Sequence, residues 1–201
     1  MKSIDNFDEI IPLLRGFWET YTDPISFHVQ VLQRKKDGHQ VGHNNKIRTI
    51  AEWFVHSEHT LLRLKPAIQS LCELYNARCY IAINGKSDKM VLWSLAETVM
   101  KYLKNNQITF KGIVSHVHDT CNGYGIKRWI VDVDDLSVDL EQLISNINLC
   151  RSGTPNNNVI CQVPTKNGIH LITHPFDLSQ IQLPAKVEIK KNNSTLLYYN
   201  E

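Results

Sequence analysis

The spacing of apolar residues in the first half of the chain predicts helices and strands in alternation. Helices are indicated where apolar side chains recur every three or four positions, and strands where short runs alternate or are rich in β-branched residues. The clearest pattern places Leu92, Leu95, Ala96, Val99 and Leu103 on one face of a helix. The full set is a helix at 5–20, strands at 27–32 and 48–55, a helix that begins at Pro66 and ends near 76, a strand at 78–84, and the helix that follows residue 88.

The second half begins with a polar, glycine-containing stretch, residues 105–125, which predicts a connection with one short strand. An apolar strand follows and ends in the carboxylates of residues 132–135. Asp139 stands where an N-cap is expected, directly before a short helix with apolar residues at helical spacing. The remaining predicted elements are strands at 159–163 and 169–173, which form a hairpin, and a strand at 185–190.

This order of elements predicts an α/β (α+β) protein. The sequence has no internal repeat and no low-complexity segment, and no clear linker divides it. We therefore expect an N-terminal α/β segment, residues 1–110, packed on a C-terminal half, residues 111–201. A single domain with two lobes is the alternative, since 201 residues suffice for one sizeable core.

Composition and charge narrow the class of protein only slightly. A hydrophobic content of 42% and a charged content of 21% are ordinary for a globular protein. The net charge of +2 is too small to indicate nucleic-acid binding by itself, so any basic footprint must be local. No stretch is apolar for long enough to span a membrane, and the N-terminus is unlike a signal peptide, so we expect a cytoplasmic protein. Its five cysteines are widely spaced, which favours reduced, buried thiols over disulfides or a zinc site.

Two stretches carry candidate chemistry. Successive side chains of a strand point to opposite faces, so Asp132 and Asp134 share one face of the strand that they end. Two neighbouring carboxylates repel each other, and a divalent cation commonly relieves the repulsion. About one helix later, residues 164–170 supply a lysine, a glycine and a histidine, which suit an anionic, phosphate-bearing ligand. Together the two stretches suggest metal-dependent chemistry on a nucleotide.

A second metal candidate is the pair formed by His116 and His118. Two histidines at alternate positions of a strand can bind one metal ion, but they are more often ordinary surface or strand residues. Both interpretations remain open at this point.

The order of a strand with Asp-x-Asp, a helix, a strand, a basic glycine turn and a strand with histidine resembles the catalytic half of the archaeo-eukaryotic primase and primase-polymerase superfamily. The resemblance covers residues 126–192, about a third of the chain. It implies an RRM-like antiparallel or mixed sheet with packed helices. It also implies a metal-dependent nucleotidyltransferase of nucleic-acid replication or repair, with a nucleotide triphosphate and DNA or RNA as partners. The small size is similar to that of compact replication proteins of bacteriophages and mobile elements.

The resemblance implies a metal site as well. Asp132 and Asp134 match the catalytic pair that holds Mg²⁺ or Mn²⁺ in this superfamily. Glu188 is the best match for a third acidic ligand on a later strand.

The resemblance assigns the nucleotide to the turn before the second strand of the hairpin. Thr165, Lys166 and Gly168 match that turn, and His170 matches its phosphate-contacting, catalytic histidine. Arg128 is a further nucleotide-binding candidate, although its side chain can point to either face of its strand.

Two other interpretations compete with this one. The same Asp-x-Asp also fits the start of haloacid-dehalogenase-type phosphatases, but residues 135–137 lack the turn that this class needs after the second aspartate. The stronger alternative is an inactive nucleic-acid-binding or replication-accessory module of the same fold. Exposed aromatic residues on the sheet, with a basic rim, would favour the module, whereas a cleft lined by carboxylates would favour the enzyme. The rim candidates are Arg34, Lys35, Lys36, Lys186, Lys190 and Lys191.

Overall fold

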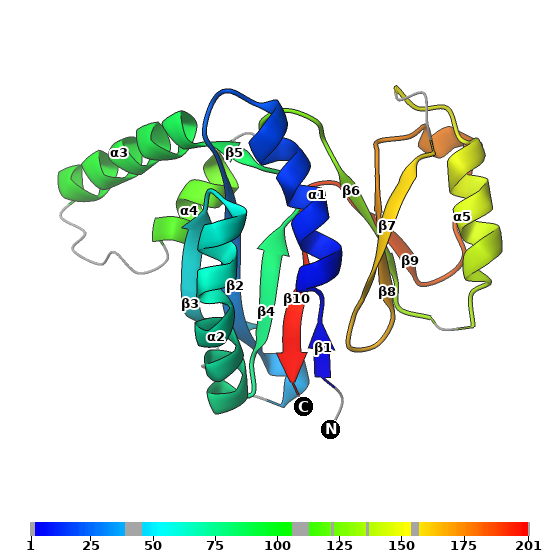
Figure 1. The fold of residues 1–201 in the computed structure, drawn as a ribbon, viewed down its shortest axis with the longest axis horizontal. Coiled ribbons are helices and arrows are strands. Elements are labelled where there is room, and N and C mark those ends of the chain that lie inside the picture. Colours follow the sequence, from blue (N-terminus) through cyan, green and yellow to red (C-terminus); the bar gives the residue numbers. More distant parts are fainter. Residues whose placement is uncertain are drawn as a thin grey trace.

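The chain forms two antiparallel sheets that stand beside each other, the first packed with several helices and the second with one (Figure 1). The structure is a computed structural model, and it describes residues 3–38, 46–105, 113–121, 123–135, 137–153 and 157–200. The mixed α+β class predicted from the sequence is confirmed.

The first sheet has the order β1-β10-β4-β2-β3, and the short β5 pairs with β2. All its pairings are antiparallel. Helices α1 and α2 cover one face of this sheet, where Phe7, Phe27 and Ile81 are fully buried in the main core. The bounds are β1 Ser3–Asp5, α1 Phe7–Thr20, β2 Ile25–Arg34, β3 Ile47–Val55, α2 Glu58–Tyr75, β4 Arg78–Ala82, β5 Lys86–Ser87 and β10 Ser194–Asn200, with a 3-10 turn at Lys35–Asp37.

The second sheet has the order β7-β8-β6-β9, again antiparallel throughout. Helix α5 packs on its outer face, around Val131, Leu143 and Ile147. The predicted cap of this helix is confirmed, because the Asp139 side chain accepts a hydrogen bond from the backbone N–H of Gln142 at 3.0 Å. The bounds are β6 Trp129–Val133, α5 Leu140–Leu149, β7 Val159–Pro164, β8 Ile169–Thr173 and β9 Val187–Lys190, with a 3-10 turn at Leu178–Gln180.

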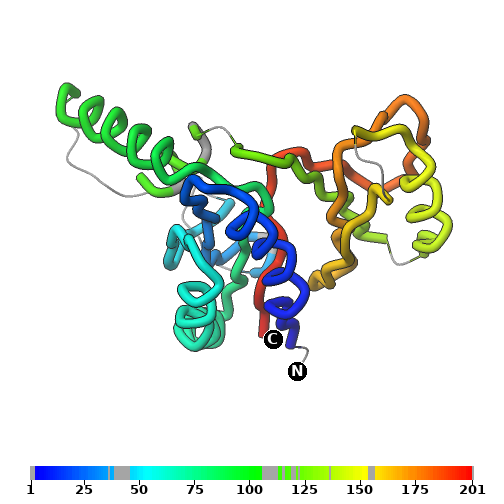
Figure 2. Tube along the Cα trace, turned by 45° about the horizontal axis from the view of Figure 1, so that its top comes forward, coloured from blue at the N-terminus to red at the C-terminus, as the bar shows by residue number. Residues whose placement is uncertain are grey.

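The chain crosses between the two sheets twice. It enters the second sheet at β6 and returns after β9 to add β10 to the first sheet, between β1 and β4. Consequently the two ends of the chain lie side by side, as Figures 1 and 2 both show. Residues 111–201 thus contribute the whole second sheet and one strand of the first.

Helix α2 begins eight residues earlier than the sequence predicts, at Glu58 instead of Pro66. Ser57 caps its N-terminus, since the Ser57 hydroxyl accepts a hydrogen bond from the backbone N–H of Thr60 at 3.1 Å. Pro66 therefore lies inside the helix, where it removes one backbone donor. A proline is favoured in the first turn, and that preference misplaced the start.

A second correction concerns residues 105–125. The described part of this stretch contains a helix, α4 (Ile113–Thr120), where a connection with a short strand was predicted. Two residues of a helix that are two positions apart point in nearly opposite directions, so His116 and His118 cannot bind one metal ion together. His116 is exposed, whereas the His118 ring packs 4.6 Å, centroid to centroid, from the ring of His28 on β2.

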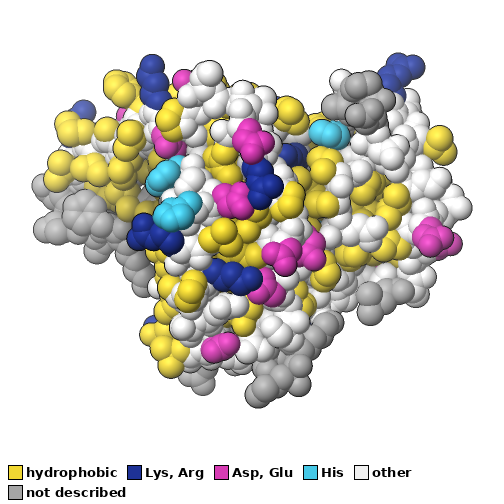
Figure 3. Space-filling view, in the orientation of Figure 1, with side chains coloured by type: hydrophobic (Ala, Val, Ile, Leu, Met, Phe, Trp, Pro, Cys, Tyr) yellow, Lys and Arg dark blue, Asp and Glu magenta, His cyan; other side chains and the backbone are white. Residues whose placement is uncertain are grey.

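Helix α3 (Asp88–Lys104) forms as predicted, but the apolar face that predicted it is largely exposed. Leu92 and Leu103 are 66% and 59% exposed, while the buried positions are Val91 and Thr98. Apolar side chains are visible at the upper left of Figure 3, where α3 lies in the same view.

The five cysteines carry free thiols, and Cys161 alone among them is not fully buried. None of the helices in the described part of the chain combines the length and apolar character that a membrane crossing requires.

Candidate functional site

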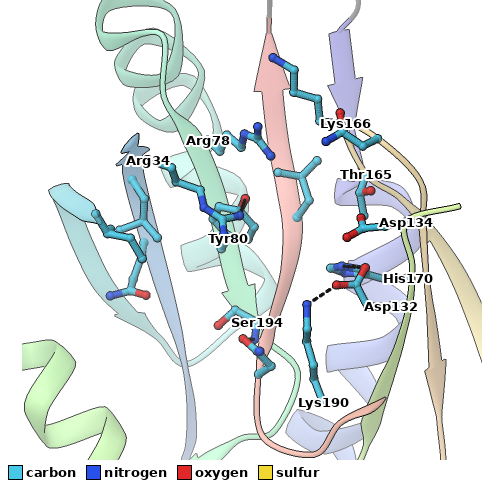
Figure 4. Close-up of a pocket in the computed structure, with 16 residues that line it drawn as sticks. Arg34, Arg78, Tyr80, Asp132, Asp134, Thr165, Lys166, His170, Lys190 and Ser194 are labelled. Carbon is cyan, nitrogen blue, oxygen red and sulfur yellow. Dashed lines mark hydrogen bonds and ion pairs between the residues drawn. The ribbon is translucent and has the colours of Figure 1, made fainter. Parts of the chain in front are cut away.

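A pocket of about 280 Å³ lies between the two sheets. Figure 4 shows Asp132, His170 and Lys190 at one end of it, and Arg34 and Arg78 toward the other. Both sheets and the segment that joins β9 to β10 contribute to the lining, so neither lobe forms the pocket alone. The lining residues are Gln30, Leu32, Arg34, Ile47, Arg78, Tyr80, Asp132, Asp134, Thr165, Lys166, Asn167, His170, Lys190, Asn193, Ser194 and Leu196.

Asp132 is the buried carboxylate of the site. Its neighbours are His170 on β8, which is paired with it in register, and Lys190 on β9. The Nε2 atom of His170 is 3.2 Å from Oδ1 of Asp132, and the ammonium of Lys190 donates to Oδ2. Burial acts to raise the pKa of Asp132, but the contacts with His170 and Lys190 outweigh it and lower the pKa to about 2.

His170 is held on both sides of its ring. Its Nδ1 atom lies 2.8 Å from the hydroxyl of Thr195 on β10. A carboxylate accepts hydrogen bonds and does not donate them, so the favourable arrangement puts a proton on Nε2, which faces Asp132. When the ring is neutral, Nδ1 then accepts from the Thr195 hydroxyl. The two sheets together therefore orient this imidazole.

The turn between β7 and β8 is closed by its own hydrogen bonds. The backbone N–H of Thr165 donates to the Gly168 carbonyl at 2.9 Å, and the N–H of Gly168 donates to the Thr165 hydroxyl at 3.0 Å. Gly168 lies against β6, because a Cβ at this position would be 2.0 Å from the carbonyl oxygen of Val133. This close approach brings the turn beside Asp134, at the end of β6.

Lys166 reaches from this turn to the first sheet. Its ammonium donates to the Tyr199 hydroxyl at 2.6 Å and lies 4.8 Å from the centre of that ring. The guanidinium of Arg78 lies 5.3 Å from the same ring. Tyr199 is thus one residue at which the two sides of the pocket meet.

The side of the pocket formed by the first sheet carries Arg34, which the sequence offered only as a candidate of a basic rim, together with Arg78 and Tyr80, which no sequence pattern had singled out. Arg34, Arg78 and Tyr80 form what we call the arginine wall. Arg78 pairs in register with Leu32, and Arg34 is two residues further along β2, so all three side chains share one face of the sheet. Arg78 and Tyr80 are two positions apart in the strand predicted at 78–84. This spacing alone could have placed both side chains on one face of the strand.

Most of the predicted site residues converge on the pocket. Asp132, Thr165, Lys166 and His170 line it, and so does the exposed Asp134. Gly168 brings the turn against β6, as described above.

Two predicted residues are placed differently. The register puts Glu188 directly opposite Asp132, on the same face of the sheet, but its side chain is exposed and does not line the pocket. Arg128 points toward α1, where it donates to the Leu13 carbonyl at 2.8 Å and lies 4.3 Å from the ring of Phe17. Arg128 therefore does not reach the pocket, because its position at the entrance to β6 directs it into the main core.

Buried asparagines hold the two sheets together. Asn84, after β4, donates to the carbonyl of Arg128 at 3.0 Å and accepts from its N–H at 2.7 Å. The Asn6 amide donates to the carbonyls of Pro164 at 2.8 Å and Leu196 at 2.9 Å. Asn6 thus ties the strand that precedes the Thr165–Gly168 turn to β10, so the N-terminal segment helps to set the width of the pocket.

The pocket offers incomplete ligation for a metal ion. The described residues contain no group of three or more histidine, cysteine or acidic side chains placed to hold a metal. Asp132 Oδ1 is nevertheless buried, and its 3.2 Å ion-pair contact with His170 Nε2 lacks the geometry of a full hydrogen bond. Asp134 is nearby and exposed, and Glu188 is on the same face, so a divalent cation fits this donor set if Glu188 turns inward and Lys190 moves away from Oδ2.

Comparison with known proteins finds no matching family model, no matching curated protein and no matching solved structure. The fold and the pocket define the class: an antiparallel α+β protein with carboxylates, cations and a histidine in a pocket between two sheets. Any assignment of function to this chain rests on that geometry.

Proposed function

We propose that the pocket binds a nucleoside triphosphate with Mg²⁺ or Mn²⁺, and that the chain is a divergent primase-polymerase-like nucleotidyltransferase of nucleic-acid replication or repair. One observation carries the proposal. Asp132 and Asp134, the Thr165–Gly168 turn and His170 come from separate stretches of the sequence, and they surround a single pocket. A pair of carboxylates beside a lysine and a histidine that can contact phosphates is a combination that suits nucleotide chemistry.

The proposal includes an RRM-like second sheet, and the order of its elements supports this. In an RRM-like unit the first and third strands are central, and the second and fourth strands are at the edges. Here β6 and β8 are central, while β7 and β9 are at the edges. Helix α5 follows the first strand as that arrangement requires, and a 3-10 turn stands in place of the second helix.

The residues of the pocket have distinct roles in this proposal. Lys166 binds the phosphates, and His170 donates to a phosphate oxygen when the ligand displaces its contact with Asp132. Asp132 and Asp134 hold the cation, with Glu188 as a third ligand. The bound cation supplies charge stabilisation during the in-line displacement at phosphorus. Thr195 orients the His170 ring for this role.

A specific observation favours a second candidate, an inactive nucleic-acid-binding module. Lys190 already neutralises Asp132, and Glu188 is turned to solvent. If Lys190 remained on Asp132 in the presence of nucleotide, the carboxylate would serve structure instead of metal binding.

The test is calorimetric binding of dATP and ATP with Mn²⁺ to the wild type and to Asp132→Asn. The substitution keeps the shape of the side chain but removes its charge. Asp8→Asn, at an exposed position of α1, is the matched control. We expect Mn²⁺-dependent binding by the wild type and the control, and its loss in Asp132→Asn with the circular dichroism spectrum unchanged. Absence of binding by the wild type would refute the proposal. Binding without primer extension would favour the inactive module.

A further inference from the structure

The arginine wall has cationic groups that the nucleotide site does not use. Arg34 donates from Nη1 to the Tyr80 hydroxyl at 3.0 Å, and its guanidinium lies 5.8 Å from the centre of that ring. Arg78 is 5% exposed and pairs with Asp37 of the adjoining 3-10 turn. Its Nε–H is buried and has no hydrogen-bond partner among the described residues. Tyr80 is half-buried between the two arginines and lines the pocket.

The charge of the pocket is unbalanced. Among the described residues, its lining contains four cationic side chains, Arg34, Arg78, Lys166 and Lys190, against two carboxylates, Asp132 and Asp134. Asp37 offsets Arg78 from outside the lining, but the described residues provide no carboxylate partner for Arg34. Like charges on neighbouring strands of one sheet face destabilise each other. An anion bound between the arginines would relieve that repulsion.

We propose that the arginine wall binds a single-stranded nucleic acid, with its phosphodiester groups on Arg34 and Arg78 and a base on the ring of Tyr80. The inference rests on the proposed function, because the strand would be the nucleic acid on which the nucleotide is used. Arginines that contact phosphates beside an aromatic ring that stacks on bases are the usual elements of a site for single strands.

The position of the wall favours a strand over the phosphates of the nucleotide itself. The turn with Lys166 and the two carboxylates belong to the second sheet, whereas the arginine wall belongs to the first. The pocket also continues from the arginines to Ile47 on the edge strand β3, which is 45% exposed. A ligand that passes Tyr80 can therefore leave the pocket along β2 and β3. A nucleic-acid strand is long enough to do this, whereas a mononucleotide is not.

The experiment measures the anisotropy of a fluorescein-labelled oligothymidylate over a range of salt concentrations. The variants are Arg34→Gln, Tyr80→Ala and Tyr80→Phe, with Arg63→Gln on the exposed surface of α2 as the charge-matched control. We expect Arg34→Gln to weaken binding and to reduce the slope of log affinity against log salt by about 0.7, since one phosphate contact is lost. Tyr80→Ala should weaken binding by about 5- to 140-fold through loss of stacking, and Tyr80→Phe by much less.

The outcomes separate this inference from the proposed function. If the wild type binds Mn²⁺ and nucleotide but not the oligonucleotide, the inference is wrong and the proposed function stands. If the oligonucleotide binds through Arg34 and Tyr80 while no nucleotide binds, the proposed function fails and the strand site remains. Equal binding by Arg34→Gln, Tyr80→Ala and Arg63→Gln would refute the site. Displacement of the oligonucleotide by tripolyphosphate at equal phosphate concentration would also refute the site. If Tyr80→Ala does not fold, Arg34→Gln alone decides.

Discussion

Replacing Gly168 with alanine tests whether the turn must touch the strand that carries the carboxylates. A Cβ at this position would lie 2.0 Å from the carbonyl oxygen of Val133, 3.0 Å from its carbonyl carbon and 3.1 Å from the Cα of Asp134. All three atoms belong to the backbone of β6 or its end, so no side-chain rotation relieves the contact. The turn and β6 must therefore separate by about 1 Å.

Such overpacking typically costs about 1–3 kcal/mol, and we expect the upper end because backbone opposes the new methyl group. For a chain of 201 residues, about 3 kcal/mol corresponds to a fall in Tm of about 6–12 °C. Urea unfolding gives the free energy of unfolding directly. Calorimetry below the transition should also show weaker binding of dATP with Mn²⁺, since Thr165 and Lys166 move away from Asp134.

Gly153→Ala is the control, because no atom of the described residues lies within 4 Å of a Cβ at that position. Its free energy of unfolding should stay within about 0.5 kcal/mol of the wild type. If Gly168→Ala is as stable as Gly153→Ala, the turn does not rest against β6 and the argument for a shared site fails.

Three further predictions concern single contacts of the pocket. Lys190→Met should strengthen Mn²⁺ binding, because an ammonium no longer competes for Oδ2 of Asp132; unchanged or weaker binding in a manganese titration would contradict this. The folded-state pKa of Asp132, about 2, lies below its ordinary 3.8, so its contribution to stability is present above about pH 4 and is lost as the pH falls toward 2. Urea unfolding of Asp132→Asn should therefore show a shallower loss of stability than the wild type over that interval, and parallel curves would contradict the ion pairs. Asn6→Ala leaves the carbonyls of Pro164 and Leu196 without their donor and should lower the free energy of unfolding by about 1–3 kcal/mol; an unchanged midpoint would show that the clamp is dispensable.

Local patterns sufficed for much of the second sheet. The hairpin of β7 and β8, the strand that ends in carboxylates and the Asp139 cap all depend on residues close together in the sequence. Alternation decides which side chains share a face, so Asp132 and Asp134 could be placed together. Gly168 could be recognised as permissive, although the sequence gives no sign of the carbonyl that makes it necessary.

Tertiary structure decided which surfaces meet. The apolar stripe of α3 predicts a helix, but periodicity does not say whether another element covers that face, and here Leu92 and Leu103 are exposed. The direction of Arg128, the ion pair of Lys190 with Asp132 and the arrival of β10 in the first sheet all depend on contacts between residues far apart in the chain. The arginine wall has the same origin. A pocket between two sheets exists only once both sheets are placed, because each supplies one side of it.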